Sequence, residues 1–159
     1  MGTVVSKGRL IEIRSQYKRD GKKVVFTNGC FDILHRGHVD YLQKAKKLGD
    51  ILIVGLNSDA SVRRLKGASR PVVCEEDRAV VLSALSAVDH VCLFDEDTPY
   101  EIIRDLVPDI LVKGADWAIE KVVGKDIVEN AGGVVRTIEF LPNRSTTSII
   151  DRIAQTTAR

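Results

Sequence analysis

This chain of 159 residues is poor in aromatic side chains, at 5%, and has one tryptophan and three cysteines. Cys30, Cys74 and Cys92 are odd in number and show no C-x-x-C spacing, which favours reduced thiols over a disulfide framework. The N-terminus lacks the apolar stretch of a signal peptide, and no apolar run approaches the roughly 20 residues that span a bilayer. The sequence therefore predicts a soluble, cytoplasmic protein with no membrane partner.

Excess charge of one sign and sequence repetition are also missing. The net charge is only +2, which does not indicate a general nucleic-acid surface, and we expect no nucleic-acid partner. No internal repeat, low-complexity segment or Pro/Gly-rich linker divides the chain. With 44% apolar residues, residues 1–159 predict a single domain with a sizeable core.

Strand and helix patterns alternate along the sequence. Leu10, Ile13 and Tyr17 recur at helical spacing and predict a short helix in an N-terminal extension, residues 1–21. The alternation predicts an α/β fold with a Rossmann-like, doubly wound, parallel five-stranded sheet and helices on both faces. Its ligand crevice is expected at the carboxyl ends of the strands. The apolar runs that predict these strands are residues 24–27, 51–56, 90–94, 110–112 and 134–138.

Residues 27–38, Thr-Asn-Gly-Cys-Phe-Asp-Ile-Leu-His-Arg-Gly-His, join the first strand to a helical pattern that Gly49 ends. His35 and His38 bracket the first turn of that helix, and at this spacing the two imidazoles can face the same side. Unpaired backbone N–H groups and the positive end of the helix dipole favour an anion there. Because Gly37 would let a phosphate approach the backbone, the motif predicts a phosphate site.

Two other interpretations of the histidine pair stay open at this point. A histidine at a helix start is often a cap or a packed surface residue. Histidine pairs also bind zinc, but His90 is the only further histidine and the cysteines lack metal-site spacing, so no protein metal ligand is identified. The protonation of His35 and His38 is open too, because a helix N-terminus lowers a histidine pKa and a bound polyphosphate raises it. Asp32 is expected to brace this loop and not to act as a base.

Polar and glycine-containing segments follow each of the first four predicted strands: residues 27–38, 57–59, 95–99 and 114–117. Carboxyl ends of parallel strands share one edge of a sheet, so these segments are expected to gather there. Thr98 is expected to cap a helix with Pro99 at its first position. Residues 145–147, Ser-Thr-Thr, open the last helix with more hydroxyls than a cap needs, which suits binding of the β and γ phosphates.

Residues 27–38 resemble the H-x-G-H signature of the cytidylyltransferase-like nucleotidyltransferase superfamily, whose members move a nucleoside monophosphate onto a phosphorylated acceptor. From about residue 23 to 153, the order of motifs resembles the adenylyltransferase domain of the bacterial heptose phosphate kinase/adenylyltransferase family. The other segments that carry the resemblance are residues 55–59 (Gly-Leu-Asn-Ser-Asp), 63–67 (Arg-Arg-Leu-Lys-Gly), 70–72 (Arg-Pro-Val), 95–99 (Asp-Glu-Asp-Thr-Pro), 112–116 (Val-Lys-Gly-Ala-Asp) and 145–150 (Ser-Thr-Thr-Ser-Ile-Ile).

The resemblance implies a set of site residues. His35, His38 and Lys66 are implied as catalytic, although a solvated surface lysine is the ordinary alternative for Lys66. Asn57, Asp59 and Trp117 are candidates for substrate binding, with packing as the alternative for Trp117. The residues implied to bind nucleotide or phosphate are Thr27, Asn28, Gly29, Phe31, Gly37, Arg78, Gly114, Asp116, Ser145, Thr146 and Thr147, where an intrahelical ion pair is the alternative for Arg78 and a plain turn for Gly114 and Asp116.

The activity implied by the resemblance is conversion of heptose 1-phosphate and ATP into ADP-heptose and pyrophosphate, for lipopolysaccharide core or related glycan precursors. ATP would be a substrate, with Mg²⁺ carried on its triphosphate. We expect a separate heptose kinase, because no sugar-kinase domain precedes residue 1, and a homo-oligomer is compatible with the sequence.

The alternative activity is that of glycerol-3-phosphate cytidylyltransferase, which shares the H-x-G-H and Ser-Thr-Thr segments. Residues 140–144, Phe-Leu-Pro-Asn-Arg, depart from the Arg-Thr-Glu-Gly usual in that family, which disfavours CTP. Arg144 also departs from the small residue usual in the heptose enzymes. A regulatory module without catalysis fits poorly, since both histidines, Lys66 and the hydroxyl triplet are present. A tRNA synthetase fragment lacks its Lys-Met-Ser-Lys-Ser-like loop.

Overall fold

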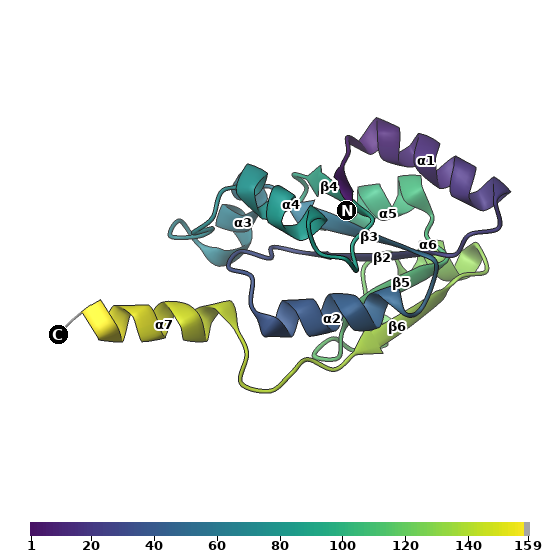
Figure 1. Ribbon diagram of the computed structural model, residues 1–159. Helices are drawn as coiled ribbons and strands as arrows, with labels where there is room; N and C mark the ends of the chain where they lie inside the picture. Colours follow the sequence, from purple (N-terminus) through teal and green to yellow (C-terminus); the bar gives the residue numbers. More distant parts are fainter. Residues whose placement is uncertain (158–159) are drawn as a thin grey trace.

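The computed structural model describes residues 1–157, which form an α/β fold around one six-stranded parallel sheet (Figure 1). The strand order is β1-β4-β3-β2-β5-β6. The strands are β1 (Thr3–Val4), β2 (Val24–Gly29), β3 (Ile51–Asn57), β4 (His90–Phe94), β5 (Ile110–Gly114) and β6 (Val134–Ile138). The helices are α1 (Lys7–Arg19), α2 (Arg36–Lys46), α3 (Asp59–Lys66), α4 (Glu75–Ser83), α5 (Tyr100–Leu106), a short 3-10 helix η1 (Ile119–Lys121), α6 (Lys125–Asn130) and α7 (Thr146–Thr157).

The predicted fold class and all five predicted strands are confirmed, and β1 adds a sixth strand at the sheet edge. Two residues are too few to show a strand pattern, so β1 could not be recognised from the sequence. It exists because Thr3 and Val4 pair in parallel with the first residues of β4.

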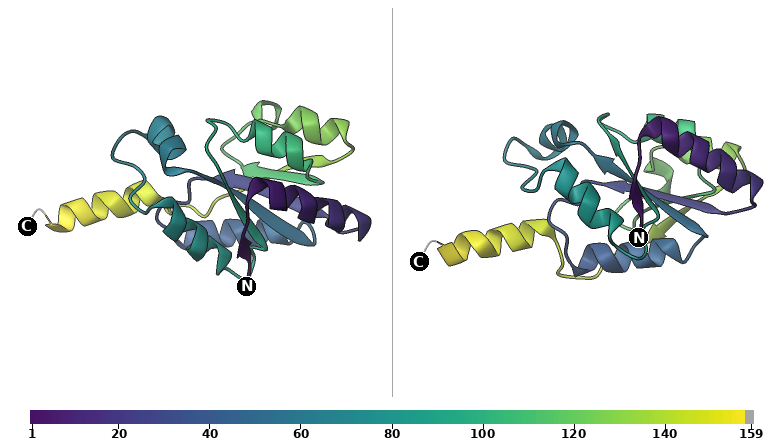
Figure 2. Two further views of the ribbon diagram at one scale, coloured as in Figure 1. Left: turned by 90° about the horizontal axis from the view of Figure 1, so that it is seen from above. Right: turned by 45° about the horizontal axis from the view of Figure 1, so that its top comes forward.

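Strand β2 runs through the middle of the core, which explains its unbroken apolar sequence. Val24, Val25 and Phe26 are each fully buried. Val25 packs in a cluster with residues of α2 and α4, whereas Val24 and Phe26 pack with residues of α1, α5 and α6. A parallel strand covered on both faces has no polar side, so the run cannot alternate. Figure 2 shows these two helical layers on opposite faces of the sheet.

The chain reverses its direction of travel across the sheet between β2 and β5. From β2 it proceeds to β3 and β4 on one side, and then crosses to β5 and β6 on the other. In an open α/β sheet, such a switch point leaves a crevice at the carboxyl ends of the two strands. The segments after β2 and β5, which carry the predicted phosphate and nucleotide motifs, therefore border this crevice.

The N-terminal extension is bonded to the core through His90, the first residue of β4. Its Nδ1 lies 2.8 Å from the Thr3 hydroxyl and its Nε2 lies 2.8 Å from the Tyr17 hydroxyl. These contacts hold β1 and α1 against the sheet. Burial lowers the pKa of His90, against an opposing effect of Asp89, so the ring is neutral in the folded protein at pH 7.

This lowered pKa predicts a pH-dependent loss of stability. An unfolded histidine titrates near pH 6.5, so between that pH and the folded pKa the unfolded chain binds more protons. The contribution of the neutral His90 ring to stability is therefore fully present above about pH 6.5, and it is lost as the pH falls below that value. We expect the melting temperature of His90→Gln to fall less than that of the wild type between about pH 7.5 and 5. His35 and His38 titrate in both proteins, and Tyr17→Phe is the control that loses a hydrogen bond but keeps the titrating ring. Parallel pH profiles for His90→Gln and the wild type would refute this role.

Of two predicted helix starts, that of α5 differs from the prediction and that of α7 agrees with it. Helix α5 begins at Tyr100 with Pro99 as its N-cap and no side-chain cap bond, so the predicted Thr98 cap is wrong. Helix α7 begins at Thr146, and the Ser145 hydroxyl accepts a bond from the Ser148 amide at 3.1 Å. None of the residues of α7 is buried, and the helix extends away from the sheet in Figure 1.

Across residues 1–157, no helix combines the length and the apolar character needed to span a membrane.

Candidate nucleotide site

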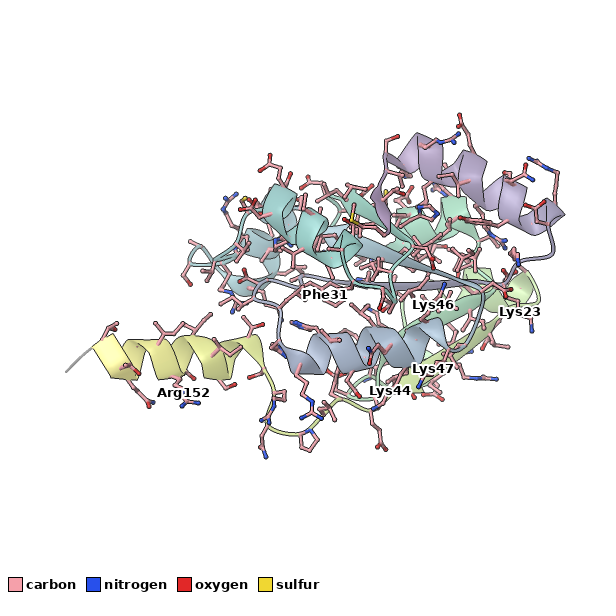
Figure 3. All side chains as sticks on the ribbon, viewed as in Figure 1. Lys23, Phe31, Lys44, Lys46, Lys47 and Arg152 are labelled. Carbon is pink, nitrogen blue, oxygen red and sulfur yellow. The ribbon has the colours of Figure 1, made fainter. Side chains whose placement is uncertain are left out.

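A cavity of about 520 Å³ lies at the carboxyl ends of β2, β3 and β5. A second cavity of about 170 Å³ shares part of its wall. Figure 3 shows Phe31, which lines both, in the loop between β2 and α2. The predicted site residues that line the larger cavity are Asn28, Gly29, Phe31, His38, Asn57, Lys66, Trp117, Thr146 and Thr147. Those that line the smaller one are Asn28, Gly29, Phe31, His38, Gly114, Asp116 and Trp117.

The two histidines of the H-x-G-H motif have different positions. His38 lines both cavities, and its ring stacks on His35 with centroids 3.8 Å apart. His35 lines neither cavity. It is the N-cap of α2, where its Nδ1 accepts a hydrogen bond from the Gly37 amide at 3.1 Å. The structure thus shows His35 as a cap and His38 as the imidazole that lines the cavities, while the implied catalytic role of His35 stays a prediction.

Both histidines are neutral at pH 7. Burial, followed by the proximity of His35, lowers the pKa of His38 to about 4. Burial and the nearby Arg144 also lower the pKa of His35. Among the described residues, the buried Nδ1 of His38 and Oδ1 of Asn28 have no hydrogen-bond partner. Buried polar atoms normally have partners, so these two atoms on residues of the cavity wall are available for a polar ligand.

Gly37 has a structural reason that differs from the predicted one. A Cβ at this position would lie 2.9 Å from the His35 ring and 3.1 Å from the Arg144 side chain. Glycine thus makes room for the cap histidine, and the approach of a phosphate at Gly37 stays a prediction. Gly114 is restricted more tightly, because a Cβ there would lie 2.1 Å from the Phe140 ring and 2.5 Å from the Asp116 carboxylate. Because Gly114 has no Cβ, the Phe140 ring can lie against it and form part of the cavity wall.

Asp32 braces the histidine loop, as expected. Its Oδ1 accepts hydrogen bonds from the amides of Val72 and Val73 at 2.8 and 2.9 Å, and its Oδ2 lies 2.6 Å from Nε of Arg70. Burial alone would raise the pKa of Asp32, but these donors together lower it. The carboxylate therefore stays ionised and ties the loop after β2 to the segment before α4.

Arg78 lines neither cavity, and its implied contact with the nucleotide stays a prediction. Its side chain is fully buried, and its guanidinium donates to the carbonyls of Val73, Cys30 and Asn57 and to the Asp59 carboxylate at 2.6 to 2.9 Å. The alternative of an intrahelical ion pair is wrong, because Asp59 belongs to α3. Arg78 and Asp59 instead fix the loops that border the cavity.

The C-terminal hydroxyl triplet divides between two tasks. Thr146 and Thr147 line the larger cavity, whereas Ser145 caps α7. Thr27 also lies outside the cavity lining. It is fully buried, and its hydroxyl lies 2.8 Å from the hydroxyl of Tyr41, which does line the smaller cavity. Thr27 therefore positions a wall residue.

Sequence reasoning missed several wall residues, notably Lys113, Tyr41, Phe140 and Arg70. Tyr41 and Phe140 pack with ring centroids 5.2 Å apart although they are far apart in the chain, and no local pattern shows such a contact. Lys113 did leave a signal: a single charged residue that follows the apolar run 110–112 at the ligand edge of the sheet.

Lys66 is exposed, lines the larger cavity, and makes no ion pair within residues 1–157. If it binds the triphosphate, Lys66→Ala should weaken ATP binding or turnover at least tenfold, about 1.4 kcal/mol, with an almost unchanged melting temperature. Lys47→Ala, which removes an exposed lysine outside the cavity walls, is the matched control. Calorimetric titration with ATP measures the effect, and equal affinities for the two variants would show that Lys66 is only a surface charge.

The switch-point crevice of a Rossmann-like sheet, lined by an H-x-G-H helix start, a lysine and a Thr-Thr helix start, defines the chain as a nucleotidyltransferase-type domain. Residues 26–152 match the family model described as Cytidylyltransferase-like. The chain belongs to this family.

Curated relatives of high identity are bifunctional proteins. The chain is 64% identical over 136 residues to the "Bifunctional protein HldE" of Syntrophotalea carbinolica, a match that covers 86% of this chain and 28% of that protein. It is 58% identical over 150 residues to the protein of the same name from Wolinella succinogenes, covering 94% of this chain and 31% of that protein. The chain thus spans about a third or less of the length of these relatives.

A solved structure with a similar fold is that of the "lipopolysaccharide core biosynthesis protein" from Thermoplasma volcanium. It superposes with a TM-score of 0.63 at 30% sequence identity, and covers 76% of this chain and 98% of the other. The likeness therefore extends over nearly the whole of that protein.

Proposed function

We propose that this chain transfers AMP from ATP to a heptose 1-phosphate and releases ADP-heptose and pyrophosphate, as a step in the synthesis of lipopolysaccharide precursors. The observation that carries the proposal is the larger cavity, which brings His38, Lys66, Thr146 and Thr147 together at the switch point. The identity of 64% and 58% to two HldE proteins supports the heptose and ATP assignment. These relatives are bifunctional proteins, and both the separate heptose kinase and a homo-oligomer of this chain stay predictions.

The proposed chemistry needs no general base and no covalent intermediate. The phosphate oxygen of the acceptor is already an anion and attacks the α-phosphorus, while the bond from that phosphorus to the pyrophosphate oxygen breaks. The protein aligns the two groups and offsets their charge. A neutral His38 donates an N–H to a phosphate oxygen. Lys66 and the hydroxyls of Thr146 and Thr147 hold the β and γ phosphates.

Mg²⁺ enters this scheme as part of the substrate MgATP. Two carboxylates line the larger cavity, and both are engaged: Asp32 by three donors, and Asp97 by Nε of Arg64 at 2.6 Å. Within residues 1–157, no three His, Cys, Asp or Glu side chains cluster as a metal site. The residues therefore do not fit a resident metal, and no step is assigned to one.

The smaller cavity suits a sugar. Asp116 and Tyr41 offer polar groups, and the exposed Trp117 ring offers an apolar face on which a sugar can pack. The sugar that enters it is either the ribose of the nucleotide or the acceptor heptose. Asn28 and Trp117 line both cavities, so the bound sugar lies next to the reacting phosphates.

The decisive comparison is between two substrate pairs. ATP with heptose 1-phosphate should give a larger kcat/KM for pyrophosphate release than CTP with glycerol 3-phosphate. The second pair tests the cytidylyltransferase alternative, which the departure at residues 140–144 disfavours. Faster turnover of CTP with glycerol 3-phosphate would replace the proposed function with that alternative.

A further inference from the structure

Lys113 lies one residue before the end of β5 and lines both cavities. His38 and Trp117 are also common to the two walls, whereas Lys66 belongs only to the larger cavity and Asp116 only to the smaller. Lys113 therefore lies where the two cavities join. In the proposed reaction, that junction is where the group carrying the sugar meets the triphosphate.

The ammonium group of Lys113 is a half-buried cation without a counter-ion. In the part of the chain that the structure describes, its Nζ makes no hydrogen bond or ion pair, and it lies over the Trp117 ring, with the centroid 5.8 Å away. The other half-buried cation of the larger cavity, Arg70, differs because it lies 2.6 Å from the buried Asp32 carboxylate. Burial lowers the pKa of Lys113 to about 8, against an opposing effect of Asp116.

An ammonium group held in this way loses hydration and gains no partner, which costs free energy in the unliganded protein. A ligand anion at the cavity junction removes that cost. His38, on the same wall, likewise has a buried Nδ1 without a partner among the described residues. Contact with the Trp117 ring holds the ammonium at the junction, since a cation is attracted to an aromatic face.

We propose that Lys113 binds a nonbridging oxygen of the α-phosphate of ATP, beside His38, and so adds a cationic group to the reaction centre. The inference rests on the proposed function for the identity of the nucleotide. As the acceptor oxygen bonds to the α-phosphorus and the pyrophosphate oxygen leaves, the nonbridging oxygens stay on phosphorus and Lys113 stays bound to them. It transfers no proton, and its charge offsets the negative charge of the crowded transition state.

Protonation of Lys113 gives this role a pH signature. The titratable groups that face it are Cys30 after β2, His38 and Tyr41 on α2, and Asp116 after β5. Burial raises the pKa of Cys30 and raises that of Tyr41 to about 12, while that of His38 is lowered to about 4. Lys113 is therefore the member of this group that loses its charge as the pH rises past about 8. The other charged residues that line the larger cavity are Asp32, Lys66, Arg70 and Asp97.

The test measures ATP affinity by calorimetric titration at about pH 7.5 and about pH 9.5, where ATP keeps the same charge. The proteins are the wild type, Lys113→Met, Lys113→Arg and, as a matched control, Lys18→Met, which removes an exposed lysine of α1. One charge-assisted hydrogen bond corresponds to about tenfold in affinity. The wild type and the Lys18 variant should therefore lose about tenfold between the two pH values. Lys113→Met should bind weakly at both, and Lys113→Arg, which stays charged, should bind equally well at both.

Melting temperatures establish that each variant is folded. If Lys113→Met does not fold, the comparison of Lys113→Arg with the wild type still tests the proposal. Affinity of Lys113→Met within twofold of the wild type, or the same pH dependence in Lys113→Arg as in the wild type, would overturn the proposal. Because the titration contains no acceptor, it is separate from the proposed function. A wild type that binds ATP with this pH dependence but does not use heptose 1-phosphate would refute the acceptor and leave Lys113 assigned.

Discussion

Replacement of His38 by alanine should lower kcat by about 10² to 10³, while ATP affinity changes much less. His38 faces both cavities, is neutral at pH 7 because burial lowers its pKa to about 4, and has a buried nitrogen without a partner among the described residues. An N–H donor that meets charge developing at the α-phosphate contributes more to the transition state than to substrate binding. Initial rates at saturating ATP, together with a direct ATP titration, separate these two effects.

The control for this prediction is His35→Asn. His35 caps α2 through the Gly37 amide, and asparagine is an equally good cap, so this variant keeps the helix start and loses the imidazole. If His35 acts through the cap, kcat of His35→Asn should stay within a few-fold of the wild type. A His38→Ala enzyme with near-normal kcat would remove His38 from the reaction centre.

Replacement of Arg78 by methionine should destabilise the protein by about 3 kcal/mol or more, because it removes one member of a buried ion pair. Arg78 is 1% exposed. Its guanidinium donates to three backbone carbonyls, from two loops and the end of a strand, and also to the Asp59 carboxylate. Methionine fills much of the volume but leaves these acceptors without donors. Urea unfolding measures the loss.

Arg64→Met is the matched control, because Arg64 pairs with Asp97 at the surface, where an ion pair contributes about 1 kcal/mol or less. Urea unfolding together with a titration with ATP decides between the two roles considered for Arg78, a phosphate ligand and a structural brace. A phosphate ligand would give normal stability and poor ATP binding. A brace gives low stability and, in the remaining folded protein, ATP binding within a few-fold of the wild type.

The core of the fold was predictable because its signals are local. Val24, Val25 and Phe26 are buried on both faces of the sheet, so their apolar run is legible without knowledge of any partner. The same holds for the H-x-G-H turn, whose two histidines and glycine are adjacent in sequence. Strand β1 was not predictable, because its two residues form a strand only through their pairing with β4.

The roles of individual site residues depended on tertiary contacts that the sequence does not show. Arg78 has the residue type and chain position of a phosphate ligand, but its acceptors come from segments up to 48 residues away, and these draw the side chain inward. Gly37 was predicted to admit a phosphate, and the sequence did not show that the His35 ring occupies the space beside it. Lys113 left one sequence signal, a charged residue after the apolar run 110–112, and its position where the two cavities meet indicates the function.

The most direct test of the central claim is the ³¹P NMR spectrum of a reaction that contains the protein, MgATP and heptose 1-phosphate. Adenylyl transfer predicts that the phosphomonoester signal of the sugar and the triphosphate signals of ATP decline together. Two mutually coupled signals of a pyrophosphate diester and one signal of inorganic pyrophosphate should replace them. Formation of ADP or AMP with the sugar phosphate unchanged, or no change in the spectrum, would contradict the claim.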